Sequence, residues 1–374
     1  MRRGRRRWLF LVAAAAALAL IIPAIVRVST PEAPSRVTVL TRNLYLGGDI
    51  TRPVRAALGR TGADAVLALG QASHELREIV DRTDFPTRSR LLATEIAAAR
   101  PDLIALQEVA LWRHGPIERD QIGRPNATEV DYDFLATLLA DLEDHGVGYD
   151  VAAQQQGSDV EAPAFEDAFD GEGRDVRLTL QDVILIRQDS PVRVTGRGGG
   201  GYQQRLDIDL GGATFSFQHG YAWADAEVGQ QRLRFIATHL ESQSAEVALV
   251  QAEELLSGPA AGEMTTVLGC DCNSAPGSPA YALLTDHGRL ADQWLEAPGD
   301  PGSGFTAILG ELVNDPTAVG LNRRIDLVLA RPAAGRSVTP ARVQLTGHQP
   351  ADRSDSGLWP SDHAGVVVEL EIGD

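Results

Sequence analysis

Short apolar runs of strand length recur along this chain from residue 37 to residue 370, and they constrain the fold more than any other feature. The clearest of these runs are Val37–Leu44, Asp102–Leu106, Asp182–Ile186, Met264–Leu268 and Val366–Leu370. Stretches with helical spacing lie between them, over residues 52–80, 88–99, 132–144 and 243–256. Because strands and helices alternate without the strict βαβ rhythm of a parallel sheet, the sequence predicts an α/β (α+β) fold with mixed sheets.

Other segments are assigned from composition and alternation. Residues 112–130 are polar and are expected to be a loop, and the acidic residues between a predicted strand at 149–154 and Asp182 are expected to be irregular. Residues 198–201 are all glycine and are expected to form a flexible turn. Residues 206–210, 213–217 and 233–238 alternate between apolar and polar side chains, which predicts the strands of an antiparallel meander.

The N-terminus carries a membrane-targeting pattern. Five of residues 2–7 are arginine, and Trp8–Val26 follow without a charged residue. A helix of that length spans about 28 Å, close to the hydrocarbon thickness of a bilayer. Residues 1–27 are therefore predicted to be a signal anchor or a signal peptide, residues 28–35 a linker and residues 36–374 the catalytic domain. We expect that domain outside the cytoplasm, on an anchor in the cell membrane, or secreted if the segment is cleaved.

The charge of the remaining chain is strongly negative. Residues 1–35 hold six of the 34 basic residues and one of the 51 acidic residues, which leaves 28 basic against 50 acidic and a net charge near −22. A domain with this charge repels polyanions on average. The composition therefore disfavours a dedicated DNA-binding protein.

Polar residues of a catalytic kind stand at the ends of several predicted strands. Asp271 and Asn273 are two residues apart, so both point to one side of an extended backbone. Taken alone, this pair is more typical of an Asx turn than of a functional site. The other strand ends carry Asn43, Glu108, His239, Asp326, Asp362 and His363. Each of these residues has a structural alternative, as a turn residue, a charge at the rim or a member of an ion pair. Asp326 lies inside an apolar run and requires a partner, either a histidine or an adjacent arginine.

The two cysteines, Cys270 and Cys272, alternate with Asp271 and Asn273 and are expected to point to the opposite face. Two cysteines do not make a disulfide framework, and zinc sites need more ligands than one C-x-C supplies. We expect both to be small buried apolar residues.

The ordered set of these residues resembles the endonuclease/exonuclease/phosphatase superfamily of metal-dependent phosphodiesterases, which includes deoxyribonucleases and sphingomyelinases. The resemblance covers roughly residues 36–370, and one departure is Cys270, where the family usually reads Gly-Asp-x-Asn. The matching pieces are Thr41–Leu44, Leu106–Val109, Thr238–Glu241, Gly269–Ser274, Arg324–Asp326 and Ser361–His363.

The resemblance implies a four-layer α/β/β/α sandwich of two mixed β-sheets flanked by helices, here preceded by the N-terminal membrane-targeting helix. It also implies roles for the strand-end residues. Glu108 is the expected main metal ligand, with Asn43 and Asp362 close by. Asp271 and Asn273 are expected to orient the attacking water and the phosphate. His363, held by Asp326, and His239 are expected to contact phosphoryl oxygens and to move protons.

The chemistry of these residues agrees with that reading. Phosphodiester hydrolysis needs a cation, a positioned water and proton donors. Oxygen ligands suit Mg²⁺ or Mn²⁺ better than zinc. The substrate is expected to be a phosphoester, either nucleic acid, a phospholipid head group or a soluble phosphate ester, and the membrane is a partner through the N-terminal segment. No protein partner is inferred.

Two alternatives stay open. The chain could be a membrane-tethered binding domain that keeps the fold without turnover, although the full set of acids and histidines argues against it. Asp182 and the acidic segment 157–175 could add to the metal site, or Asp182 could pair with His239. The sequence assigns no role to His219.

Overall fold

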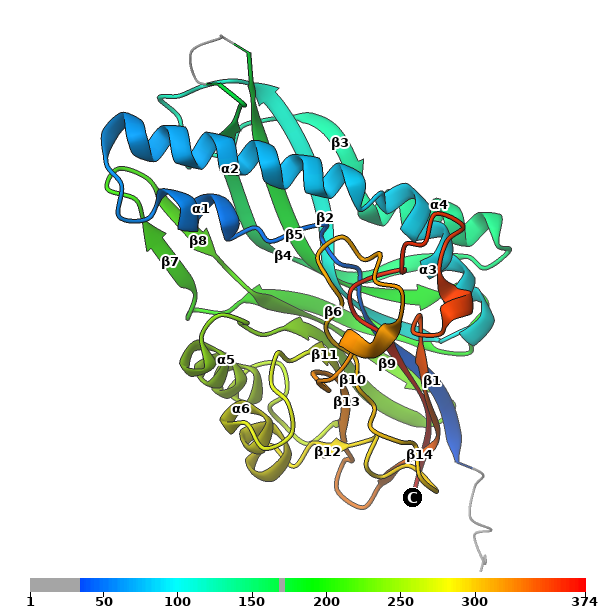
Figure 1. The fold of residues 1–374 in the computed structure, drawn as a ribbon. Coiled ribbons are helices and arrows are strands. Elements are labelled where there is room, and N and C mark those ends of the chain that lie inside the picture. Colours follow the sequence, from blue (N-terminus) through cyan, green and yellow to red (C-terminus); the bar gives the residue numbers. More distant parts are fainter. Residues whose placement is uncertain (1–33, 168–171) are drawn as a thin grey trace, which may run out of the picture. The chain divides into compact units, whose positions relative to one another are not determined.

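Two β-sheets lie face to face with helices on their outer sides in the computed structural model, which describes residues 34–167 and 172–374 (Figure 1). The predicted membrane-targeting segment lies outside the described residues, as do all but the last two residues of the predicted linker. Within the described ranges, no helix has both the length and the apolar character needed to cross a bilayer.

The first sheet has the strand order β14–β15–β1–β2–β5–β4, with β3 paired to β2. Its strands are β1 (Ser35–Asn43), β2 (Leu103–Pro116), β3 (Glu129–Asp133), β4 (Tyr149–Ala164), β5 (Arg174–Arg187), β14 (Ser337–Thr346) and β15 (Gly365–Gly373).

The second sheet has the order β12–β13–β11–β10–β9–β6. Its strands are β6 (Arg193–Gly201), β9 (Gly220–Val228), β10 (Gln231–His239), β11 (Thr265–Asp271), β12 (Ala291–Asp292) and β13 (Asp326–Arg331). A separate hairpin joins β7 (Leu206–Asp209) to β8 (Thr214–Phe217).

The helices complete four layers. Helices α2 (Gly62–Arg82), α3 (Phe85–Ala99) and α4 (Phe134–Asp144) pack on the first sheet through one hydrophobic cluster. Helices α5 (Ala245–Ser257) and α6 (Pro279–Ala282) pack on the second sheet through another. A third cluster, which includes Val39, Ile184 and Phe235, fills the space between the sheets. The predicted sandwich of two mixed sheets flanked by helices is confirmed. With three clusters of its own, the part from residue 34 onward is expected to fold without residues 1–32.

The helices begin where the sequence supplies caps. The side chains of Asp84, Asp133 and Ser244 accept backbone N–H groups in the first turns of α3, α4 and α5. The stretch expected to be one helix over 52–80 is interrupted after α1 (Arg52–Ala57) by a turn at Gly59, whose φ of 78° favours glycine.

The strand pairing brings the predicted polar strand ends to one edge. In the first sheet β1 and β2 are parallel, with Asn43 opposite Gln107. In the second sheet β10 and β11 are parallel, with His239 opposite Asp271, and the antiparallel β13 starts at the same level with Asp326 opposite Asp271. The carboxyl ends of parallel strands and the start of an antiparallel neighbour therefore coincide.

Four predictions about the irregular segments are wrong. Strand β2 continues to Pro116 and pairs with β3, so residues 112–130 are not all loop. The residues from 155 to 181 largely form the long β4–β5 hairpin. Residues 198–201 are not a turn but belong to β6, and their missing side chains leave room for Trp223 and Tyr221 of β9. In the expected meander only β7 and β8 pair with each other, while β10 pairs with β9 and β11.

Candidate active site

A cleft of about 450 Å³ opens at the edge where the polar strand ends meet. Of the predicted site residues, Glu108, His239, Asp271, Asn273, Asp362 and His363 line it directly. Asn43 and Asp326 lie directly beneath these residues, because Asn43 is hydrogen-bonded to Glu108 and Asp326 to His363. We refer to these eight residues as the floor of the cleft. The structure thus brings all eight predicted residues to one site.

Glu108 enters the cleft because β2 bulges there. The register between β2 and β5 shifts between Leu106 and Val109, and Glu108 has a φ of 54°, which is uncommon for a residue with a side chain. Its Oε2 accepts the backbone N–H of Leu46 at 2.8 Å, and its Oε1 accepts from Nδ2 of Asn43 at 3.0 Å. Each oxygen keeps a lone pair free for a cation.

Asn43 links the two acidic groups of the floor. Its Nδ2 donates to Glu108 and also to Oδ2 of Asp271, at 3.0 Å in each case. Its Oδ1 accepts the backbone N–H of Tyr45 at 2.8 Å. In this arrangement Asn43 presents its amide nitrogen, and not an oxygen, to the carboxylates.

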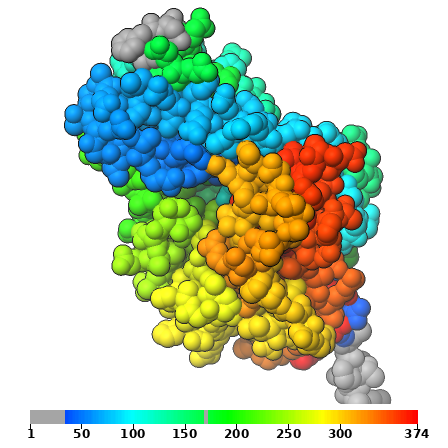
Figure 2. Space-filling view, viewed as in Figure 1, coloured from blue at the N-terminus to red at the C-terminus, as the bar shows by residue number. Residues whose placement is uncertain are grey.

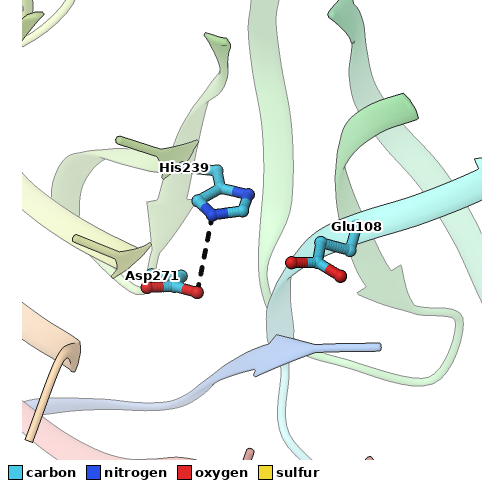
Figure 3. A group of neighbouring side chains, drawn as sticks. All are labelled: Glu108, His239 and Asp271. Carbon is cyan, nitrogen blue, oxygen red and sulfur yellow. Dashed lines mark ion pairs between the residues drawn. The ribbon is translucent and has the colours of Figure 1, made fainter. Parts of the chain in front are cut away.

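Asp271 lies at the centre of the floor, between the two histidines. Its Oδ2 is 3.5 Å from Nε2 of His239 and 3.8 Å from Nδ1 of His363 (Figure 3 draws the first pair beside Glu108). Burial raises the pKa of Asp271, but the two imidazoles and the hydrogen bond from Asn43 outweigh burial and leave that pKa below its usual value. Asp271 is therefore ionised at neutral pH.

Asn273 fixes the protonation state of His239. Its Nδ2 donates to the backbone carbonyl of Leu240 at 2.9 Å and lies 2.9 Å from Nε2 of His239. Because the amide nitrogen is a donor, Nε2 of His239 accepts and the ring is neutral. Burial, the largest influence, also lowers the pKa of His239. Asn273 adopts a φ of 46°, so the backbone turns sharply directly after the strand.

His363 and Asp326 form a buried pair. Nδ1 of His363 lies 2.8 Å from Oδ2 of Asp326, and because the carboxylate can only accept, Nδ1 carries the proton. Burial lowers the pKa of His363, but Asp326, Asp362 and Asp271 together raise it well above its usual value. The predicted histidine partner of Asp326 is thus observed, whereas the neighbouring Arg324 pairs with Asp292.

The carboxylate of Asp362 makes only long polar contacts among the described residues. Its Oδ1 lies 4.0 Å from Nε2 of His363 and 3.4 Å from the hydroxyl of Ser361. Burial raises its pKa to about 7, and the charge of Glu108 contributes to the rise. A group in this position gains from any cation placed next to it.

Two buried arginines support the site from behind, and no sequence pattern indicated them. Arg88 is fully buried and donates to the backbone carbonyls of Leu44, Tyr45, Thr83 and Pro360. It therefore ties the turn after Asn43 to the segment before Asp362. Arg42 donates to the backbone carbonyl of His363 and pairs with Glu95 at 2.7 Å.

The prediction of two free cysteines is wrong, because Cys270 and Cys272 form a disulfide bond. Both are fully buried on the side of the strand that faces α5 and α6, as the alternation predicted. The two Cα atoms are 5.2 Å apart, less than the roughly 6.6 Å of two steps along an extended strand, so the backbone contracts at Asp271 and lets the two sulfur atoms meet. The bond therefore brackets the central carboxylate of the site.

Asp182 and His219 lie beside the site. Asp182 is buried and shares a small recess with Glu108, His219 and His239, but no hydrogen bond joins it to His239 in the described chain. Burial raises its pKa well above the usual value. His219 contacts the edge of the His239 ring, with 4.6 Å between ring centroids, and pairs with Glu241 at 3.6 Å. None of the described acids of segment 157–175 lines the cleft.

The donor set of the floor fits a hard divalent cation. Ligand atoms of Glu108, His239 and Asp271 lie within 4.8 Å of one another, as do those of Asp271, Asp326 and His363. Oδ1 of Asp326 is buried without a hydrogen-bond partner. Buried acids in excess of their partners are costly to the fold unless a cation offsets their charge, and oxygen donors favour Mg²⁺ or Mn²⁺.

Comparisons with known proteins concern the family and the fold of this chain. A sequence model of the Endonuclease/Exonuclease/phosphatase family matches residues 70–363. A family protein from Bacteroides thetaiotaomicron has a similar structure, with 15% identity and a TM-score of 0.53 over 92% of this chain and 97% of that one. TDP2 from D. rerio, complexed with a single strand DNA product, is similar at 15% identity and a TM-score of 0.51, over 90% and 99% of the two chains.

A third similar structure, from Bacteroides vulgatus, has the same identity, TM-score and coverage as TDP2. No curated protein matches the chain's sequence. At these identities the structural likeness concerns the fold alone.

Proposed function

Because the chain belongs to the endonuclease/exonuclease/phosphatase family, it is a metal-dependent phosphoester hydrolase, and we propose that it cleaves phosphodiester bonds with Mg²⁺ or Mn²⁺. One observation carries the proposal: the His363–Asp326 pair and the ionised Asp271 face one cleft together with Glu108. Hydrolysis needs a proton donor, a group that orients water and a cation site, and these residues supply one of each.

Glu108 and Asp362 are the residues proposed to hold the ion, with Asp271 next to them. A divalent cation supplies charge stabilisation for the phosphoryl oxygens and lowers the pKa of a bound water. Asn43 keeps Glu108 and Asp271 in place through its two donated hydrogen bonds.

The other residues act on the substrate and on protons. Asp271 is ionised, so it can accept a hydrogen bond from the attacking water and orient it. Asp326 holds the Nδ1–H of His363 and stabilises the protonated ring, which leaves Nε2 for a phosphoryl oxygen. His239 is neutral and fixed by Asn273, so its role is to position the phosphate.

Activity measurements on residues 34–374 test the proposal. We expect turnover of a chromogenic phosphodiester with Mg²⁺ or Mn²⁺ that stops in EDTA and returns when the ion is restored. Full turnover in EDTA, or restoration by zinc alone, contradicts it. Plasmid DNA, RNA, sphingomyelin and phosphatidylinositol in the same panel compare the three substrate classes. One similar structure, TDP2, carries a single strand DNA product, which is the reason to include nucleic acid.

We also propose that the catalytic domain lies outside the cytoplasm, anchored or released by residues 1–27. The arginine cluster before an uncharged apolar run supports this placement, and a disulfide bond is typical of an oxidising compartment. Protease added to cells with permeabilised outer layers should digest the domain. A domain that stays protected contradicts the placement.

A further inference from the structure

We propose that one wall of the cleft, formed by Ile50, Leu180, Leu206 and Phe217, binds an apolar group that the substrate carries next to its phosphate. The substrate is then a small phosphodiester of an apolar alcohol, not a polynucleotide. This inference rests on the proposed function, because the wall selects a substrate only if the floor hydrolyses it. We refer to these four residues as the apolar wall.

The apolar wall is built from four separate elements. Ile50 precedes α1, Leu180 is on β5, Leu206 on β7 and Phe217 on β8, and all four line the cleft that also holds Glu108 and His363. Ile50, Leu206 and Phe217 pack in one hydrophobic cluster, yet Ile50 and Leu206 stay partly exposed. Apolar side chains that remain open to a cleft, beside convergent polar groups, are typical of a ligand site.

The apolar wall continues into a second, smaller space. Ile50 and Phe217 also line an apolar cavity of about 40 Å³, whose other walls include Trp112, Val160 and Leu178. The two spaces are adjacent at Ile50 and Phe217, and Glu161 is the one charged residue among the described residues that line the smaller space. The main cleft of about 450 Å³ is large enough for a small organic ester, since such sites measure roughly 300–1,000 Å³.

The charges of the cleft rim disfavour a polyanion. Arg52 is the one arginine among the described residues that line the cleft, and its Nη2 lies 2.7 and 2.6 Å from the two carboxylate oxygens of Glu311. The guanidinium is thus already neutralised. Asp49 and Glu241 also line the cleft. Burial raises the pKa of both, but hydrogen bonds from Thr51 and Arg55 to Asp49, and for Glu241 the imidazole of His219 at 3.6 Å with the backbone N–H of Gln243, outweigh burial and keep both acids ionised.

A polynucleotide needs basic groups along its path on either side of the cleaved bond. The Arg52–Glu311 contact instead joins the start of α1 to the loop that carries Ile308 and Leu309. Figure 2 shows the segment around residue 310, in orange, against the blue segment around residue 50, with a recess below their contact. Favourable charge for a phosphate is therefore confined to the floor, where His363 and a bound cation would supply it.

A series of p-nitrophenyl alkyl phosphates tests the proposal on residues 34–374 with Mg²⁺. The leaving group is constant, so only the methyl, butyl or hexyl group changes. We expect kcat/KM to rise with chain length, by up to about fourfold per buried methylene. The hexyl ester in solution is then compared with a lipid in vesicles that carries the same p-nitrophenyl phosphate group. This comparison separates a soluble substrate from a membrane lipid. Preference for the soluble ester supports the inference, and turnover only on vesicles overturns it.

Leu206→Ser and Ile208→Ser form a matched pair for the same assay. Both residues are on β7, point to the same face, are half-buried and pack in the same cluster, but only Leu206 lines the cleft. Leu206→Ser should lower the hexyl-to-methyl ratio of kcat/KM at least threefold, whereas Ile208→Ser should leave the ratio unchanged. Melting temperatures of both variants exclude a folding effect.

The outcomes separate the two proposals. If the wild type hydrolyses the diesters but kcat/KM does not depend on alkyl length, the apolar wall has no such role and the proposed function stands. If an oligonucleotide is a better substrate than every alkyl ester, the inference is overturned as well. If no diester is hydrolysed with any divalent ion, the proposed function fails and this inference fails with it.

Discussion

The floor of the cleft holds mostly buried acids and the charged cluster around Asp159 holds half-buried groups, and the two regions balance charge in opposite ways. In the cluster, Asp159 accepts from Nε and Nη2 of Arg177 at 2.8 and 2.7 Å and from Thr179 at 2.9 Å. Burial raises the pKa of Asp159, but these bonds outweigh it. The chain itself supplies every partner that this carboxylate needs.

The floor has an excess of acid. Five carboxylates lie in the floor or beside it, those of Glu108, Asp182, Asp271, Asp326 and Asp362, and no arginine of the described chain forms an ion pair with them. The imidazoles within 4 Å of these acids are those of His239 and His363, whereas His219 pairs with Glu241. The difference teaches that buried charge alone does not mark a functional site. An unbalanced charge of one sign does, because it predicts a partner from outside the chain.

The largest expected effect concerns Glu108. Glu108→Gln should reduce turnover to the level that remains in EDTA, because one formal charge of the cation site is lost. In the wild type, Mg²⁺ at about 100 times its Kd should stabilise the fold by about 2.7 kcal/mol, and this gain should vanish in the variant. Activity assays and thermal melts with and without Mg²⁺ measure both effects.

Asp159→Asn is the matched control from the other region. It removes the carboxylate that Arg177 and Arg113 share, so it should lower the melting temperature and leave kcat unchanged. If Glu108→Gln keeps both its activity and its stabilisation by Mg²⁺, the floor does not hold the ion.

The His363–Asp326 pair should show the next largest effect. His363→Ala should lower kcat on the order of 10²–10⁴-fold, which is usual for a positioned proton-transfer group. Asp326→Asn should also be damaging, and the double variant should fall little further than the worse single one, because the residues act as a unit. Measuring kcat and melting temperature on the same four proteins separates catalysis from folding.

The chain offers an equivalent pair away from the cleft. Nδ1 of His114 lies 2.8 Å from Oδ1 of Asp131, the same separation as in the His363–Asp326 pair. His114→Ala and Asp131→Asn should leave kcat unchanged. Losses that multiply in the His363/Asp326 double variant, or a fully active His363→Ala, would refute the paired role.

The floor could be predicted from sequence because its residues follow short apolar runs. Asn43, His239 and Asp271 end buried strands, and Glu108 follows the buried apolar run of β2 at the bulge of that strand; strand pairing then brings these positions together. The supporting groups could not be predicted in this way. Arg88 acts through four backbone carbonyls that come from segments near residues 44, 83 and 360, so no local pattern identifies it.

The long strands were missed because their polarity suggests loops. Residues of β4 such as Gln155 and Gln156 are polar because β4 is the edge strand of its sheet, and edge strands tolerate polar side chains. Strand β9 did carry a usable signal, since its buried and half-buried residues alternate over Gly220–Val228. The disulfide bond depends on a local contraction of the backbone at Asp271, which brings the two Cα atoms to 5.2 Å and which the spacing of two cysteines does not reveal.

The disulfide bond is expected to act on the floor more than on global stability. Replacing both Cys270 and Cys272 by alanine should lower kcat several-fold, because Asp271 lies between them and loses a constraint on its position. The closed loop is very short, so the loss of stability should be only about 1–2 kcal/mol. Kinetics and denaturant unfolding measure the two quantities. An unchanged kcat, with the bond shown to be absent, would mean that the strand alone holds Asp271.

The smallest expected effect is a gain of function at the rim. Glu311→Gln should release Arg52 as a free cation, so activity on a short oligonucleotide should rise about two- to fivefold at low ionic strength and the gain should shrink with added salt. Glu75→Gln is the matched control. Oε1 of Glu75 lies 3.5 Å from Nη1 of Arg52, but Glu75 is more exposed than Glu311 and does not line the cleft. Steady-state rates at two salt concentrations measure the change. If both variants raise the oligonucleotide rate equally, net charge and not the Arg52–Glu311 contact determines the response of this rim to polyanions.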